Sequence, residues 1–219
     1  LIKAEEEMTD IRRLYQIMVA HCGEQNWPAE SKPEIVLGAI LVQNTSWESA
    51  QKSLDQLKEA TAFDPQRILQ LDDQTLQALI RPSGFYRTKS KAIRAVFEWL
   101  DDFNFDYAAI WQRFGKNLRR ELVKLRGVGN ETADVLLIYV FDVPAFVADN
   151  YAQKLFAHLG VSSKNYQDLA RQITLPVDFT FPEAQAFHGL IDDVGKKFFR
   201  GQCTFDDSLL AAFDLGLLC

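Results

Sequence analysis

The most informative stretch of the sequence is Leu125-Arg126-Gly127-Val128-Gly129-Asn130-Glu131-Thr132-Ala133-Asp134, which has a helical pattern on each side. Two glycines around one apolar residue permit a tight turn in which the backbone can approach a ligand closely. Asn130 is a suitable cap for the helix that follows. Backbone N–H groups would then gather at the positive end of a helix, which favours a phosphate anion. The same pattern is also compatible with an ordinary turn between two helices.

Helical spacing extends in both directions from this stretch. Residues 11, 14, 15 and 18 are apolar at the spacing of one helix face, and alternating, strand-like runs are scarce. Residues 36–42 are apolar on all sides, which predicts a central buried helix, and residues 45–48 have the spacing of a capping box. The expected fold is all-α, with about ten short helices. We expect a helical, barrel-like domain at 33–140 that carries the turn, and a second helical domain formed by 1–32 plus 141–219.

Length and composition exclude several classes of protein. A chain of 219 residues with 47% hydrophobic residues can bury a real core, so we expect neither disorder nor a fibre. No apolar run approaches the roughly 18 residues of a membrane span, and residues 1–30 lack a secretory pattern. Cys22, Cys203 and Cys219 are odd in number and widely spaced, which favours reduced thiols. The protein is expected to be cytoplasmic, with no membrane partner.

The charge is unevenly distributed along the chain. The net charge of -6 argues against nucleic acid, because phosphate neutralisation supplies most non-specific affinity for DNA. However, residues 81–94 carry five basic side chains and no acid, and residues 113–126 carry six against one. Each stretch therefore has a charge of +5, and the remaining residues sum to -16. This asymmetry indicates a basic face on an acidic body, although long helices also carry solvated Lys and Arg without a partner.

A second candidate for chemistry lies downstream. Asp149 follows the apolar residues 145–148 and immediately precedes a predicted helix. An aspartate in this place is commonly a helix N-cap. A carboxylate between apolar walls is also a group whose pKa can be tuned for catalysis. The sequence pattern leaves both interpretations open.

Four motifs together resemble a known family. The hairpin of 125–134, followed by Asp149, resembles the helix-hairpin-helix, Gly-Pro-Asp superfamily of DNA base-excision glycosylases, specifically its endonuclease III branch. Residues 41–45 are similar to the family's helix-end glutamine segment, and residues 80–92 to its glycine-aromatic-x-x-Lys-x-x-Ala segment. The motifs occur in the family's order and cover about residues 33–160.

The resemblance implies roles for individual residues. Asp149 would be the catalytic aspartate, and Gln43 would enter the space left by a flipped base. The DNA would lie in a cleft between the two domains. Further residues implied to contact DNA are Asn44, Arg87, Lys89, Arg126, Gly127, Val128, Gly129 and Asn130.

Two departures from the family pattern limit the chemistry. Bifunctional members carry a lysine in the pattern Gly-x-Gly-x-Lys-Thr-Ala, whose amine forms a Schiff base with the sugar; here Glu131 occupies that position. Members of the family also usually hold a 4Fe-4S cluster on four cysteines near the C-terminus. Only Cys203 and Cys219 lie there, so we expect no metal and no 4Fe-4S cluster.

These departures, together with Trp27-Pro28 ahead of the glutamine segment, resemble the 3-methyladenine DNA glycosylases of the endonuclease III branch. An N3-alkylated adenine is cationic and already a good leaving group, and it would stack well on aromatic faces. Phe85 is a further stacking candidate, and His188 is equally a core histidine or a pocket residue. The expected substrate pocket contains Trp27, Pro28, Trp47, Glu131 and Lys196.

The sequence therefore predicts a monofunctional DNA glycosylase that excises alkylated purines, such as 3-methyladenine, in base-excision repair. Its partner would be duplex DNA containing damaged bases, and it would act as a monomer in the bacterial cytoplasm, associated with the nucleoid. Two alternatives stay open. One is a glycosylase for mismatched or deaminated bases, and the other is a non-catalytic helix-hairpin-helix module that binds DNA.

Overall fold

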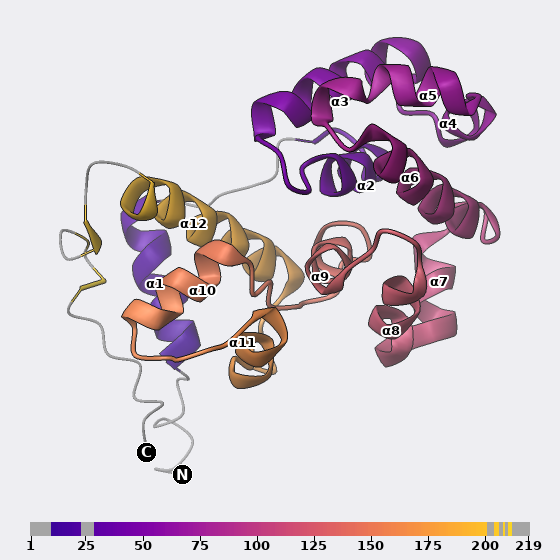
Figure 1. Cartoon of the computed structure of the whole chain (residues 1–219). Helices are drawn as coiled ribbons and strands as arrows, with labels where there is room; N and C mark the ends of the chain where they lie inside the picture. The colour runs from indigo at the N-terminus through magenta and orange to yellow at the C-terminus, as the bar shows by residue number, and fades with distance from the viewer. Residues whose placement is uncertain (1–9, 23–28, 201–203, 206–207, 209, 212–219) are drawn as a thin grey trace. The chain divides into compact units, whose positions relative to one another are not determined.

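The computed structural model describes residues 10–22, 29–200, 204–205, 208 and 210–211. Within these ranges the chain forms helices and no strand, so the predicted all-α fold is confirmed (Figure 1). The chain divides into two compact units, which are residues 28–141, called here the central unit, and residues 1–27 with 142–219, called the terminal unit. The sequence pattern places these boundaries at 33 and 140. A DNA-binding cleft between the units stays a prediction.

The central unit is one continuous stretch of the chain, whereas the helices of the terminal unit come from both ends of it. The terminal unit contains α1 (Asp10–Cys22), α10 (Asn150–His158), α11 (Tyr166–Gln172) and α12 (Phe181–Phe199). The central unit contains α2 (Lys32–Leu41), α3 (Trp47–Thr61), α4 (Pro65–Gln70), α5 (Asp73–Leu79), the 3-10 helix η1 (Arg81–Ser83), α6 (Tyr86–Asp101), α7 (Tyr107–Phe114), the 3-10 helix η2 (Gly115–Asn117), α8 (Leu118–Lys124) and α9 (Asn130–Tyr139). Among the described residues, none of these helices combines the length and the apolar character that crossing a bilayer requires.

Helix α2 forms the core of the central unit. It packs against α3, α6 and α9, and Leu37, Ile40 and Leu41 are fully buried. Burying one such side chain contributes about 1.5–3 kcal/mol. The helix begins where Ser31 Oγ accepts a hydrogen bond from the Glu34 backbone N–H, with a proline in the first turn. The predicted central buried helix is therefore confirmed, and it fixes the position of the loop that follows Leu41.

The capping box predicted at residues 45–48 is wrong. Ser46 is the N-cap of α3, and its Oγ accepts a hydrogen bond from the Ser49 N–H at 3.3 Å. Glu48 cannot complete the box because it lies at the second position of the helix, where it pairs with Lys52 at 2.8 Å. The consequence is that α3 begins one residue later than the pattern predicts, with Trp47 as its first residue.

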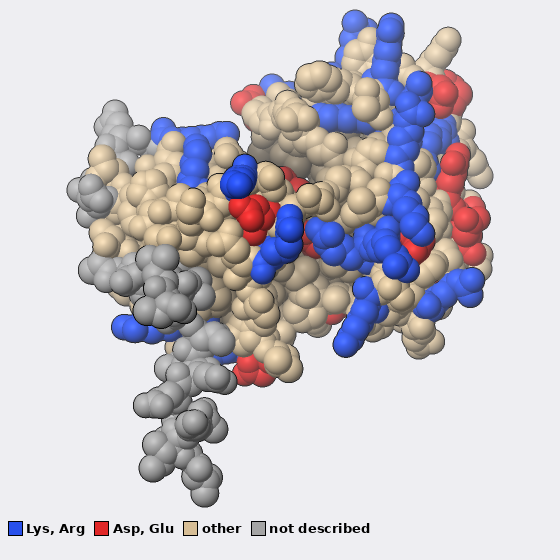
Figure 2. All heavy atoms as spheres, turned by 60° about the horizontal axis from the view of Figure 1, so that its bottom comes forward, with Lys and Arg blue, Asp and Glu red and all other residues tan. Residues whose placement is uncertain are grey.

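The two basic stretches of the sequence, residues 81–94 and 113–126, belong to the central unit, which over its whole length has as many acidic as basic residues. Figure 2 shows Lys and Arg side chains spread over its surface, with few acidic side chains among them on this face. The basic face is therefore provided by a single compact unit.

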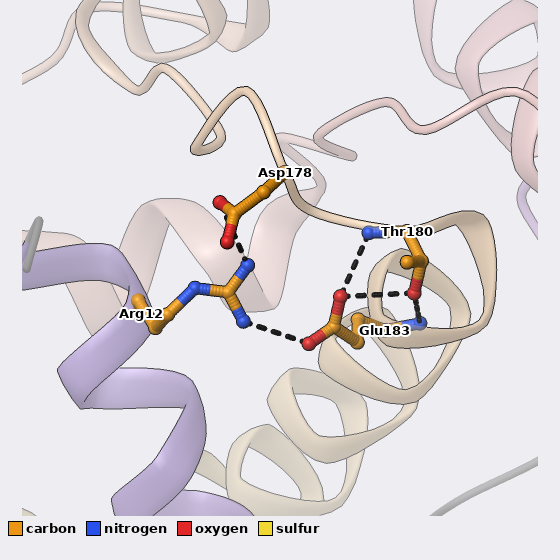
Figure 3. Close-up of polar contacts among 4 residues, drawn as sticks. All are labelled: Arg12, Asp178, Thr180 and Glu183. Atoms are coloured by element: carbon orange, nitrogen blue, oxygen red, sulfur yellow. Dashed lines mark hydrogen bonds and ion pairs between the residues drawn. The ribbon is translucent and has the colours of Figure 1, made fainter.

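The terminal unit joins the two ends of the chain through Arg12 of α1. Its guanidinium donates to Glu183 Oε1 at 2.7 Å and lies 3.1 Å from Asp178 Oδ1 (Figure 3). The same guanidinium lies over the ring of Phe179, 4.9 Å from its centre. Glu183 also forms a capping box with Thr180 at the start of α12. The N-terminus of α12 is thus held by both side-chain capping and a contact with α1.

The contact between α10 and α12 is unusually close. Gly195 lies against the ring of Tyr151, and a Cβ at this glycine would overlap the ring atoms. Glycine is therefore required because the α10 side chain occupies the space that any other residue would need. This contact sets one face of α12 against the beginning of α10, where Asp149 lies.

Candidate functional site

The hairpin between α8 and α9 needs its first glycine for two reasons. Gly127 has a φ of +79°, in the left-handed region, and a Cβ there would overlap Ala92 Cβ of α6. Val128 is buried, and its backbone N–H bonds to Leu125 O at 3.1 Å. Gly127 therefore lies directly against Ala92 of α6, and a backbone hydrogen bond closes the turn around the buried Val128.

The second glycine leaves the start of α9 open. Gly129 is the N-cap of α9, no side chain caps this end, and a Cβ at Gly129 would meet nothing within 4 Å. Backbone N–H groups of a first turn have no partner within the helix, and the helix dipole places positive charge there. The arrangement can bind a phosphate anion through the backbone, as predicted for this hairpin.

Asn130 does not cap α9, so that prediction is wrong. It is the first residue of the helix, and its Oδ1 accepts a hydrogen bond from Arg119 Nη2 at 3.3 Å. Arg119 also binds both carboxylate oxygens of the buried Asp134, at 2.7 and 2.8 Å. Because Arg119 lies on α8 and Asp134 on α9, this bidentate pair fixes the two helices on either side of the hairpin. Glu131 and Arg126 are exposed beside it.

Gln43 connects the loop after α2 to the hairpin. Its Nε2 donates to Gly127 O at 3.2 Å and to Thr132 Oγ1 at 2.9 Å. Asn44 follows in the left-handed region, with a φ of 53°, and is exposed. The predicted entry of Gln43 into a DNA stack would have to exchange these two hydrogen bonds for new ones.

Lys89 requires a correction. The family resemblance implies that it contacts DNA, but it is 3% exposed, and its Nζ donates to Leu41 O at 2.8 Å and to Ser83 O at 2.7 Å. Burial lowers the pKa of this ammonium to about 8. Its charge is therefore directed into the protein, where it links the end of α2 to the turn that leads into α6.

The turn that Lys89 holds presents an aromatic side chain. Phe85 is 68% exposed and has a φ of 46°, a conformation that a bulky residue adopts only when its surroundings impose it. The guanidinium of Arg87 lies 5.9 Å from the ring centre of the neighbouring Tyr86. Such an exposed ring beside cations can be inserted between DNA bases. The sequence marks Phe85 only as a stacking candidate, since its exposure depends on the fold.

The expected residues that would stack on a damaged base are only partly described. Trp47 lies at the start of α3 and is 38% exposed. Trp27 and Pro28 lie outside the described residues. Their predicted role in stacking a damaged base stays a prediction.

Asp149 combines both interpretations that the sequence leaves open. It is the N-cap of α10, where its Oδ1 accepts a hydrogen bond from the Ala152 N–H at 2.7 Å. Its Oδ2 lies 4.0 Å from His188 Nε2 of α12, and the side chains are 14% and 15% exposed. Burial raises the pKa of Asp149 from 3.8 to about 6, with a smaller contribution from Asp192, while N–H donation opposes the increase. Near pH 7 the carboxylate is thus charged but poorly solvated.

Three polar residues of α12 lie on the side of the helix that approaches Asp149. His188, Asp192 and Lys196 are spaced four residues apart, which places them on one helix face. Lys196 Nζ forms an ion pair with Asp192 Oδ2, and this contact raises the pKa of Lys196 against the opposing effect of burial. The interval of four residues between these polar side chains is visible in the sequence and could have indicated that they share one helix face. The predicted contact of Lys196 with a substrate stays untested.

The terminal unit contains a poorly solvated carboxylate, that of Asp149, close to the imidazole of His188. Such a carboxylate can stabilise a developing positive charge more strongly than one in water. It can also accept a proton from an attacking water, because its pKa of about 6 lies near neutral pH. The described residues contain no group of three or more His, Cys, Asp and Glu side chains that could hold a metal ion.

Comparison with known proteins gives consistent matches. The family model described as HhH-GPD superfamily base excision DNA repair protein matches residues 37–178. A protein of Methanocaldococcus jannaschii that is provisionally named a DNA repair glycosylase is 36% identical, over 96% of this chain and 98% of its own. Endonuclease III of Sulfolobus acidocaldarius is 28% identical over 74% of this chain and 71% of its own.

Solved structures share the fold. A 3-methyladenine DNA glycosylase of H. pylori bound to 1,N6-ethenoadenine superposes with a TM-score of 0.69 at 24% identity, covering 86% of this chain and 98% of its own. An endonuclease III in a non-covalent complex with DNA superposes with a TM-score of 0.71 at 22% identity, covering 92% of each chain.

Proposed function

Because this chain belongs to the HhH-GPD superfamily of base excision DNA repair proteins and is a DNA glycosylase of that family, we propose that it removes alkylated purines, such as 3-methyladenine, from duplex DNA without cutting the strand. The fold it shares with a 3-methyladenine DNA glycosylase supports the substrate class. The observation that carries the proposal is the largely buried carboxylate of Asp149, which caps α10 and lies 4.0 Å from His188 Nε2.

In the proposed reaction the base can leave with little assistance from the protein. An N3-alkylated adenine already carries positive charge, so its glycosyl bond breaks without a strong general acid. Positive charge then develops on the sugar, and Asp149 stabilises it through space in a site with little water. Asp149 also accepts the proton of the water that attacks the sugar carbon. The free base and an abasic site are the products.

The proposed absence of lyase chemistry follows from residue 131. Strand cleavage by this family's bifunctional members begins with an amine that attacks the sugar. Glu131, in the first turn of α9, supplies a carboxylate in place of that amine. A carboxylate cannot form a Schiff base, so the sugar keeps its bond to the strand.

The family's 4Fe-4S cluster does not fit this chain. Such a cluster takes four cysteine thiolates, whereas the sequence contains three cysteines, of which Cys22 lies on α1. We therefore propose that the protein works without a cluster. We also propose that it acts as a monomer, on DNA of the nucleoid in the bacterial cytoplasm. Iron analysis of the purified protein tests the first point, and gel filtration tests the second. Stoichiometric iron would contradict the argument that three cysteines cannot supply the four thiolates of a cluster.

Release of free base from methylated duplex DNA tests the substrate. We expect chromatography to detect 3-methyladenine, and we expect the strand to break only after alkali treatment. Borohydride should trap no protein–DNA adduct. Release from deaminated or mismatched duplexes instead would favour the alternative glycosylase, and tight DNA binding with no release from any duplex would favour a non-catalytic module. A trapped adduct would show that another amine attacks the sugar.

A further inference from the structure

A hollow of about 430 Å³ lies on the surface of the central unit, apart from the hairpin glycines. We call it the α8 groove, because its lining comes from α8 and the turn before it. Four of its five lining residues are basic, and the fifth is an exposed valine. They are Lys116, Arg119, Arg120, Val123 and Lys124.

The charge of the α8 groove is only partly neutralised. Arg119 is bound to Asp134 through both carboxylate oxygens, and Lys124 is bound to both oxygens of Glu121, at 2.8 and 2.7 Å. Arg120 lies 3.9 Å from the same Glu121 and is 71% exposed. The four cations therefore face two carboxylates, which leaves about two positive charges available to a ligand.

The shape and lining of the groove select the kind of ligand. The hollow is lined by long cationic side chains from α8 and from η2, which precedes it, and no aromatic ring lines it. It is therefore unsuited to stack a base. An extended polyanion fits better, since its charges would meet cations along the helix while Val123 contacts an apolar part such as a sugar.

The position of the groove identifies the polyanion. Helix α8 ends at Lys124, and the hairpin whose backbone can bind phosphate follows it directly. The rise of a helix is about 1.5 Å per residue, so the groove and the hairpin are separated by roughly 10 Å. Because double-stranded DNA carries one charge per about 1.7 Å, a duplex bound at the hairpin has further phosphates within this distance.

We propose that the α8 groove binds the sugar–phosphate backbone of the duplex beside the damaged nucleotide, as a second anchor in addition to the hairpin. This inference rests on the proposed function only in taking duplex DNA as the ligand. The groove contributes affinity without sequence preference, since the proposed contacts are to phosphates and sugars, which carry no sequence information directly.

The test measures the salt dependence of binding to an undamaged duplex. The variant is Lys116→Gln combined with Arg120→Gln, which removes two exposed charges and keeps side-chain length. The control is Lys52→Gln combined with Lys58→Gln on α3, which removes the same charge from exposed positions of the same unit. Affinity is measured by fluorescence anisotropy over a range of salt concentrations, and circular dichroism confirms folding of each variant.

We expect the slope of log K against log salt to decrease by about 1.8 in the groove variant, since each phosphate contact contributes about 0.9. Between roughly 50 and 200 mM salt, the affinity of the wild type should therefore fall about 12-fold further than that of the variant. The control should keep the wild-type slope. Equal slopes for the groove variant and the wild type would overturn the proposal and leave an acidic protein as the next ligand to test. An equal decrease in the control would also overturn it, because total charge would then be responsible.

The readout is independent of catalysis. A protein that shows the expected slopes but releases no base would contradict the proposed function and leave this inference intact. A protein that releases base but keeps its slope in the groove variant would contradict the inference alone.

Discussion

The charge of Asp149 should make the folded protein less stable, and Asp149→Asn should show this. Burial raises the pKa of this carboxyl from 3.8 to about 6. A pKa raised in the folded state means that the folded protein holds the proton more tightly than the unfolded chain does. Wild-type stability therefore decreases as the pH rises from about 4 to about 6 and then levels off. Asparagine does not titrate, and it caps helices as well as aspartate does.

The size of the effect follows from the shift in pKa. One pKa unit corresponds to about 1.36 kcal/mol. A pKa raised from 3.8 to about 6 in the folded state therefore lowers the free energy of unfolding by about 3 kcal/mol when the carboxylate is fully charged. Asp149→Asn should be more stable than the wild type, by a smaller amount at pH 5 than at pH 8, where the difference should reach about 3 kcal/mol. The same variant should lose base release, because the neutral amide cannot stabilise a cationic sugar. Its DNA affinity should stay close to that of the wild type.

Urea unfolding at the two pH values measures the stability, and chromatography measures the released base. Asp72→Asn is the matched control, because Asp72 is the N-cap of α5 and accepts a hydrogen bond from the Thr75 N–H at 2.9 Å. The hydroxyl of Thr75 lowers the pKa of Asp72, so this variant should gain no stability at high pH and should retain base release. An Asp149→Asn protein with the same stability difference at both pH values would refute the argument from burial. Base release at the wild-type rate would refute the catalytic role.

Three further predictions concern the central unit. Gly127→Ala should lower the free energy of unfolding, measured in urea, by about 2–4 kcal/mol, because of the left-handed φ and the overlap with Ala92. Gly129→Ala should change the free energy of unfolding by less than about 1 kcal/mol and should weaken binding to any duplex. Equal stabilities of the two variants would contradict the geometry. Lys89→Met should lower the free energy of unfolding by about 2–4 kcal/mol, because two buried carbonyls lose their hydrogen-bond donor. It should leave the slope of log K for DNA binding against log salt unchanged, and a slope lower by about 0.9 would indicate a phosphate contact. Gln43→Ala should slow base release with a smaller effect on affinity for undamaged DNA, and an unchanged single-turnover rate would exclude Gln43 from base flipping.

Local patterns in the sequence predict the helices well. Residues 36–41 form the buried end of α2, and Asp149 precedes a helix as the spacing indicates. Both features depend on neighbours within one helical turn, so a short window of sequence contains their cause. The cap at Asn130 fails for the opposite reason, since Arg119, eleven residues earlier, binds its side chain.

The parts that the sequence does not predict depend on contacts between distant segments. Lys89 lies in a basic stretch and looks like a solvated cation, yet the carbonyls that bury it belong to residues 41 and 83. Gln43 reaches Gly127 and Thr132, which lie more than 80 residues later. No local pattern distinguishes these side chains from exposed ones, because only the packed arrangement of α2, α6 and α9 brings their partners within reach.

Asp149 shows why a structural and a catalytic interpretation of one residue need not compete. The N–H groups at the start of α10 hold Oδ1 in place and keep the carboxylate charged, since donation to it lowers its pKa. Burial and Asp192 act in the opposite direction, and the balance at about 6 leaves an anion that is ionised near pH 7 but weakly solvated. Removing the cap alone would free the side chain to move toward solvent, where its charge would be screened. The cap is thus part of the proposed mechanism, because it holds the charge where solvent would otherwise weaken its effect on the sugar.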